Sequence, residues 1–150
     1  MAYGKYVARQ DAVSVSTAVS LIEITAPSTA ICEITRLKIS QSGSATGVAL
    51  RVQALRKSAA GTGTSFTPVP TAAGMPAAGT TARHTMTVEG TPSTVEFDEG
   101  FNNLAGWEWV AFDELSRIIV PPSGIFALKF AAAPGSAQTV SAIIEFIEKG

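Results

Sequence analysis

The sequence predicts an all-β domain, because apolar residues alternate with polar ones in several runs and turn residues separate the runs. The clearest run extends from Val48 to Arg56, where Arg51 and Gln53 lie between apolar neighbours. Similar runs cover residues 93–98 and 125–130. No stretch has the apolar spacing of a capped amphipathic helix, although residues 113–116 could form one helical turn. We therefore expect about eight antiparallel strands in a sandwich, a barrel or a jelly roll.

The other expected strands are β-branched segments bounded by turn residues. They cover residues 19–25, 31–40, 108–112, 117–120 and 139–148, with residues 6–15 as a leading strand or an arm. A chain of 150 residues suits one domain, 1–150, with its own core. The alternation predicts these core residues: Val48, Leu50, Val52, Val95, Phe97, Phe126, Leu128 and Phe130.

The composition favours binding to proteins over binding to nucleic acid or crossing a membrane. Hydrophobic residues make up 46% of the chain and charged residues 15%, well below the ~25% of an average soluble domain. A weakly charged surface costs little to desolvate against a partner. The net charge is −1 and the 11 Lys and Arg residues are scattered, whereas nucleic-acid binding needs a concentrated basic face. No apolar run approaches the roughly 20 residues of a membrane span.

The sequence offers no catalytic or metal-binding constellation, so we expect neither an enzyme nor a cofactor. His84 is the only histidine, and no G-x-S-x-G elbow presents a serine to it. A metal-binding barrel needs several such ligands. The one cysteine, Cys32, lies in an apolar stretch and is expected to be a buried, inert thiol. Acidic residues within 96–99 and 113–114 are expected to be solvated or to form ion pairs between subunits, with calcium binding or glycoside hydrolysis as weaker alternatives.

Three segments are candidates for intermolecular contact. Residues 58–81 form a long Gly/Ala/Thr/Pro-rich excursion, whose prolines favour an ordered, extended path over a neighbouring surface. A flexible surface loop is the alternative. Residues 1–15 precede the regular pattern and could leave the domain as an arm. Trp107 and Trp109 lie in the densest aromatic stretch, where core packing competes with an interface anchor or a sugar-stacking platform.

Three stretches resemble a group of small structural proteins from tailed bacteriophages. The first, residues 49–92, passes from a strand through Gly-Thr-Gly-Thr into the Pro/Ala/Gly excursion and returns through Thr-Val-Glu. The second is EGFNNLAGWEWV, and the third is RIIVPPSG followed by the apolar strand 125–130. The sequence is similar to phage capsid decoration, or cement, proteins, whose fold is a jelly roll resembling tumour necrosis factor.

The resemblance implies a jelly-roll β-sandwich that assembles as a homotrimer on the capsid exterior. Its partners would be the major capsid protein and further copies of itself, with no nucleic acid, membrane or cofactor. The protein would be made in the host cytoplasm and reside in the virion. Expected interface residues are Tyr3, Tyr6, Arg9, Phe66, Val69, Met75, Trp107 and Trp109. The alternatives are a phage tail or neck component, a carbohydrate- or receptor-binding module that uses the tryptophans, and a glycan hydrolase that uses Glu96 and Asp98.

Overall fold

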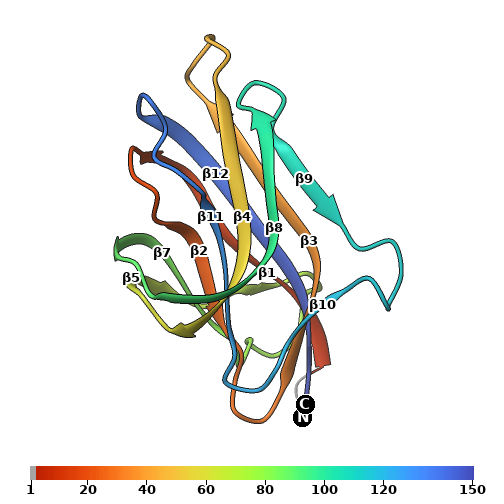
Figure 1. The fold of residues 1–150 in the computed structure, drawn as a ribbon. Coiled ribbons are helices and arrows are strands. Elements are labelled where there is room, and N and C mark those ends of the chain that lie inside the picture. The colour runs from red at the N-terminus through yellow and green to blue at the C-terminus, as the bar shows by residue number, and fades with distance from the viewer. Residues whose placement is uncertain (1–2) are drawn as a thin grey trace.

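Two six-stranded antiparallel sheets face each other across one apolar core (Figure 1). The computed structural model describes residues 3–150, with side chains from Gly4 onward, and no described residue is helical. Sheet A has the order β10 (Ile118–Val120), β3 (Ile31–Ser42), β12 (Gln138–Lys149), β1 (Tyr3–Val15) and β6 (Val69–Pro70), with β9 (Trp107–Val110) also paired to β3. Sheet B has the order β5 (Thr62–Phe66), β7 (Thr81–Val88), β2 (Ser20–Thr25), β11 (Ile125–Phe130), β4 (Ala49–Ala59) and β8 (Thr91–Asn102).

The all-β prediction is confirmed, although the structure has twelve strands within residues 3–150 where about eight were expected. Every segment predicted as a strand is one, with small shifts of its ends. The three strands that were missed are β5, β6 and β7. The expected helical turn at residues 113–116 is instead a tight turn held by Asp113 and Ser116.

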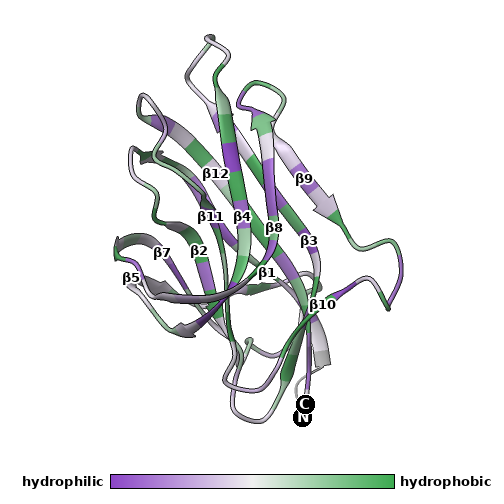
Figure 2. Ribbon diagram, in the orientation of Figure 1, coloured by the Kyte–Doolittle hydropathy of each residue, from purple (hydrophilic) through white to green (hydrophobic). Residues whose placement is uncertain are grey.

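The core forms where the alternating faces of the two sheets meet (Figure 2). Strand β12 is the regular example, because its even-numbered side chains from Gln138 to Glu148 are all buried. From sheet A, Tyr6 stacks on Phe146 with ring centroids 5.8 Å apart. Most of the predicted core is confirmed: Leu50, Val52, Phe126, Leu128 and Phe130 are buried, and Val48 and Phe97 are half-buried against them.

Val95 is the exception, since its side chain is 48% exposed. A β-bulge explains the wrong prediction. Along the β4–β8 pair, Ala54 lies opposite Phe97 and Leu55 lies opposite Val95, so Glu96 is an extra residue without its own partner. An extra residue reverses the face onto which the following side chains point. Phe97 therefore faces the core and Val95 faces away from it.

Residues 3–15 form a sheet strand, so of the two alternatives the leading strand is confirmed and the N-terminal arm is wrong for these residues. Strand β1 pairs with β12 from Tyr3 opposite Lys149 to Val15 opposite Gln138. Its inward side chains Tyr6 and Ala8 are fully buried. Removing this segment would take an inner strand out of sheet A.

The excursion at residues 58–81 is ordered, but it packs on its own subunit. Strand β5 pairs with β7 in sheet B, and β6 then pairs with β1 in sheet A. The segment therefore passes from one sheet to the other along one side of the sandwich. Further contacts hold the remaining residues of the excursion against the domain, including a backbone hydrogen bond of 2.9 Å from Thr71 N to the Lys5 carbonyl. The excursion therefore contributes two edge strands that the Gly- and Thr-rich composition did not predict.

Candidate functional site

The predicted interface residues at the N-terminus do not form a free surface. The side chain of Tyr3 lies outside the described side chains. Tyr6 is fully buried and donates a hydrogen bond of 3.2 Å from its hydroxyl to the Pro76 carbonyl. Arg9 is exposed and forms a 3.3 Å ion pair with Asp11. Tyr6 is therefore a core residue that anchors the excursion, whereas Arg9 faces solvent.

The two tryptophans join the sheets at the side formed by β8 and β9. Trp107 is only 8% exposed, and its indole Nε1 donates a 2.7 Å hydrogen bond to the Glu99 carboxylate. Trp109 is half-buried, with its ring centroid 5.3 Å from that of Phe97. The core-packing interpretation of this stretch therefore holds, and Trp107 does not form an open platform for sugar stacking.

The excursion residues are divided between the core and the surface. Phe66 is half-buried, with its ring centroid 5.0 Å from that of His84. Met75 is half-buried and occupies the space that a side chain on Gly4 would fill. Val69 is more than half exposed. Of these three predicted interface residues, Val69 alone presents a mainly exposed apolar side chain.

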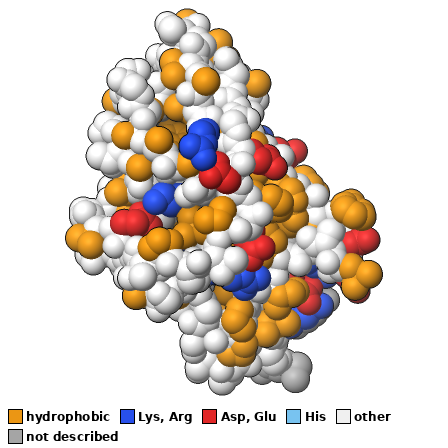
Figure 3. Space-filling view, viewed as in Figure 1, with side chains coloured by type: hydrophobic (Ala, Val, Ile, Leu, Met, Phe, Trp, Pro, Cys, Tyr) orange, Lys and Arg blue, Asp and Glu red, His pale blue; other side chains and the backbone are white. Residues whose placement is uncertain are grey.

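Among the described residues, the most exposed large apolar side chains lie on the loop between β9 and β10, which the sequence analysis did not select. Phe112 is 88% exposed and Leu115 is 96% exposed. The loop projects at the right in Figure 1, and Figure 3 shows hydrophobic and acidic side chains together there. Ser116 N donates a 2.7 Å hydrogen bond to Asp113 Oδ1, which fixes the turn between the two apolar residues. Two large apolar residues flanking an Asp-Glu pair were the available sequence signal.

Three of the exposed acidic residues that the sequence singled out, Glu96, Asp98 and Glu114, form ion pairs within the chain. Glu96 accepts a 2.6 Å hydrogen bond from Arg56, and Asp98 lies 2.7 Å from Arg51. Bonds from the Gln53 amide and Arg51 lower the pKa of Asp98. No group of three or more His, Cys, Asp or Glu residues in the described chain is placed to hold a metal ion.

A buried ion cluster lies on the face of sheet B that points away from the core. Lys57 Nζ donates to Glu23 Oε2 at 2.7 Å and to Ser20 Oγ at 2.8 Å, and it also contacts the Glu89 carboxylate. Lys57 and Glu23 have fully buried side chains. Burial raises the pKa of Glu89, but hydrogen bonds from Lys57 and Ser20 outweigh burial, so its pKa is lowered overall. These charged groups satisfy one another.

A second buried carboxylate, Glu148, holds the end of the excursion. It accepts hydrogen bonds of 3.0 Å from Gly79 N, 2.8 Å from Thr80 N and 2.6 Å from Thr80 Oγ1. The Cys32 sulfur lies 3.0 Å from the same Thr80 hydroxyl. Burial raises the pKa of the Cys32 thiol to about 11, against the opposing effect of the Thr80 hydrogen bond. The thiol is therefore protonated and inert near neutral pH.

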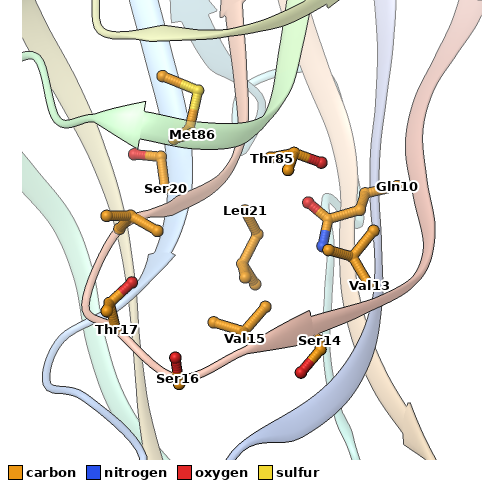
Figure 4. Close-up of a pocket in the computed structure, with 11 residues that line it drawn as sticks. Gln10, Val13, Ser14, Val15, Ser16, Thr17, Ser20, Leu21, Thr85 and Met86 are labelled. Atoms are coloured by element: carbon orange, nitrogen blue, oxygen red, sulfur yellow. The ribbon is translucent and has the colours of Figure 1, made fainter.

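A cavity of about 100 Å³ opens where β1 of sheet A faces β2 and β7 of sheet B. Figure 4 shows the Gln10 amide on one side, Thr85 and Met86 above, and Val15 below. Gln10 is only 3% exposed, and its Nε2 has no hydrogen-bond partner. A buried donor without a partner costs about 1–3 kcal/mol.

Unusual backbone conformations occur in the wall of this cavity and beside it. Ala12 has φ +45° and lies in the bulge between Gln10 and Val13. Thr85 has φ +50° and lines the cavity. Left-handed conformations of residues other than glycine cost roughly 1–3 kcal/mol each, and they concentrate at functional sites. Of the three such residues in the described chain, Thr85 therefore lines the cavity, and Ala12 lies outside the lining, two residues from Gln10.

Comparison with known proteins found no matching family model, no matching curated protein and no matching solved structure. The described residues contain no helix that is long and apolar enough to cross a membrane. The described part of the chain itself offers two candidate sites. They are the exposed β9–β10 loop and the cavity beside Gln10.

Proposed function

We propose that this chain is a phage capsid decoration protein, a jelly-roll domain that binds the outer capsid surface as a homotrimer and stabilises contacts between capsid subunits. The observation that carries the proposal is the β9–β10 loop, whose Phe112 and Leu115 side chains lie almost wholly in water. Exposed apolar side chains that cluster on a fixed turn are typical of protein-binding surfaces. The sequence resemblance supplies the particle and the number of subunits.

The loop suits a role as one of three attachment points. Burying a Phe or Leu side chain fully stabilises a complex by about 1.5–3 kcal/mol. A trimer presents six such side chains, worth roughly 9–18 kcal/mol before the costs of association are subtracted. Once one subunit of the trimer is bound, the other two are held close to the capsid, which raises their effective concentration at its surface. A trimer that spans the joints between capsid subunits opposes their separation under the pressure of packaged DNA.

The charge beside the loop indicates what the capsid surface should carry. Asp113 and Glu114 lie between the two apolar residues, and the Glu114 side chain is 82% exposed. Glu114 lies 3.7 Å from Arg117, which also forms a 2.7 Å ion pair with Glu33. The loop therefore presents two exposed apolar side chains with acidic residues between them in the sequence, and a partner with apolar grooves beside basic residues complements it.

A binding experiment with a double loop variant tests the proposal. We expect the wild-type chain to be a trimer by light scattering at micromolar concentration and to co-sediment with undecorated capsids. Phe112→Ser/Leu115→Ser should keep the trimer and its melting temperature but bind capsids at least 100-fold more weakly. The matched control is Val88→Ser/Val95→Ser, which removes two roughly half-exposed apolar side chains of sheet B; it should bind like wild type.

Two results would overturn the proposal. One is unchanged capsid binding by the loop variant, and the other is a stable wild-type monomer at micromolar concentration. The copy number in a purified particle distinguishes a decoration protein from the related alternative, a tail or neck component. Hundreds of copies agree with a decoration protein, whereas a handful agree with a tail or neck part.

A further inference from the structure

The free edge of strand β8 is a third surface, outside both the β9–β10 loop and the cavity beside Gln10. Strand β8 forms one edge of sheet B, and within the described chain it pairs with β4 alone (Figure 1). It has 12 residues, of which only Phe97 and Phe101 are half-buried and the others are exposed. The edge of such a strand presents a row of backbone groups with which a further strand can pair.

We propose that residues 97–102 of this edge bind an extended segment of a partner protein, which joins sheet B as a further strand. The segment carries an apolar side chain and a Lys or Arg two residues apart, both pointing towards the gap between the sheets. In this kind of recognition main-chain hydrogen bonds provide affinity, and alternate side chains provide specificity. The inference does not depend on the partner being a capsid protein.

The backbone groups at the centre of this edge are free to bond. Asn103 N donates a 3.0 Å hydrogen bond to the Val48 carbonyl, so these two residues are a hydrogen-bonded pair at the end of the β4–β8 ladder. Hydrogen-bonded and non-hydrogen-bonded pairs alternate along an antiparallel ladder. The N–H and C=O groups of Asp98 and Gly100 therefore point away from β4, and no hydrogen bond within the described chain satisfies them.

The usual protection of an edge strand is missing at this centre. Bulges, prolines and charged side chains normally keep other strands away, but Pro92 and the bulge at Glu96 both precede residues 97–102. The Asp98 carboxylate is held over its own sheet by Arg51, 2.7 Å away on β4. Gly100 is exposed and has no side chain to block an approach. A glycine within a strand often marks a place where another backbone comes close.

The side chains that face the gap between the sheets determine the chemistry of the partner. Phe97, Glu99 and Phe101 alternate onto this face of β8. Trp109 of β9 is half-buried against Phe97, with ring centroids 5.3 Å apart, so an apolar side chain on the added strand extends this contact. Glu99 is exposed, accepts a hydrogen bond from Trp107 and belongs to no ion pair of the described chain. A Lys or Arg on the added strand supplies the missing cation.

The same charge argument disfavours a second copy of β8 as the added strand. The strand TPSTVEFDEGFN contains three carboxylates and no Lys or Arg. A second β8 would therefore bring no cation to Glu99 and would place like charges side by side, which is unfavourable across a strand pair. The edge is complementary to a segment of opposite charge.

Nuclear magnetic resonance of the full-length ¹⁵N-labelled chain, titrated with the peptide acetyl-Thr-Leu-Thr-Lys-Thr-Leu-Thr-amide, tests the proposal. We expect saturable shifts and slower hydrogen exchange of the Asp98 and Gly100 amides, and a shift of the Trp109 indole signal. A peptide with Glu in place of Lys should bind at least tenfold more weakly. A peptide with N-methyl groups on the two Thr residues next to Lys should not bind, because it lacks the donors that face β8.

Variants locate the binding. Glu99→Gln keeps an acceptor for Trp107 but removes the charge, so it should bind the Lys and Glu peptides equally. Asp11→Asn is the matched control, since Asp11 is an exposed carboxylate on β1; it should bind like wild type. Gly100→Pro should keep the β4–β8 ladder, because this N–H points away from β4, and it should lose the peptide.

Three results would overturn the proposal. The first is the absence of saturable shifts with the Lys peptide, and the second is binding that survives N-methylation of the peptide. The third is a change of the Asp98 and Gly100 signals with protein concentration alone, which would show that β8 pairs with a second copy. None of these measurements uses a capsid, so failure here leaves the proposed role of the β9–β10 loop to its own test.

Discussion

Replacing Lys57 by methionine tests whether the buried ion cluster is essential to sheet B. Lys57 lies on β4, Glu23 on β2 and Glu89 in the connection between β7 and β8, so one ammonium group ties together three parts of the sheet. The Lys57→Met substitution keeps a side chain of similar length with an apolar stem. It removes only the charge and the three hydrogen-bond donors.

The magnitude follows from what remains around Glu23 after the substitution. Its carboxylate is fully buried and keeps only the Arg83 guanidinium at 3.3 Å and the Gly61 amide at 3.1 Å. Both contacts are longer than the 2.7 Å bond that is lost. Removing one partner of a buried ion pair costs about 3–5 kcal/mol, because the remaining charge is left poorly compensated. For a domain of this size each 1 kcal/mol lowers the melting temperature by roughly 2–4 °C.

Urea unfolding at a fixed protein concentration measures the effect. We expect the midpoint to fall with an unchanged slope, which is the sign of lost stability without a change in the surface exposed on unfolding. Lys129→Met is the control, since Lys129 is half-buried on the neighbouring β11 and has no ion pair within the described chain. Its cost should stay below about 1 kcal/mol. A loss of less than about 1 kcal/mol for Lys57→Met would refute the reasoning.

Three further predictions concern other parts of the fold. Cys32 should not react with a thiol reagent at pH 7 until the protein unfolds, because burial raises its pKa to about 11; reaction at the rate of a free thiol would contradict this. The pKa of Glu89 is lowered in the fold, so its pairing with Lys57 should stabilise the protein above about pH 4.3, the ordinary pKa of glutamate. That contribution should disappear as the pH falls further, and an unfolding midpoint independent of pH between 5 and 2, roughly the range in question, would exclude it. Gly90→Ala should destabilise by about 1–3 kcal/mol in calorimetry, because a side chain there would overlap the Ala59 carbonyl; an unchanged melting temperature would show that the backbone can shift.

The alternation of apolar and polar residues predicted those strands that have one face in the core and the other closer to solvent. Strand β12 is buried on one face and half-buried on the other along its whole length, so its pattern was readable. Strand β7 was missed because Arg83 and His84 are half-buried in succession and leave no clean alternation. Val95 was assigned to the wrong face because the bulge at Glu96 depends on the pairing with β4. The register between two strands depends on both of them, so the sequence of one strand alone does not reveal a bulge in the pair.

The candidate sites were harder to predict than the fold. Tyr6 was expected at an interface from its residue type, but it fills the core against Phe146. Phe112 and Leu115 were not selected, because exposure depends on the direction in which a loop leaves the sheets. The cavity beside Gln10 combines residues from β1 and β7, which lie far apart in the sequence, so no local pattern could have indicated it.

The pairing of β1 with β12 has a consequence for how the protein is made. Strand β1 leaves the ribosome long before its main partner β12, because the ten other strands are synthesised between them. Pairings between such distant segments form slowly, since a long loop must close first. During synthesis β1 therefore waits as an unpaired strand edge, open to association with other nascent chains. We expect the soluble yield to depend strongly on growth temperature and on chaperones that hold the early segment until synthesis is complete.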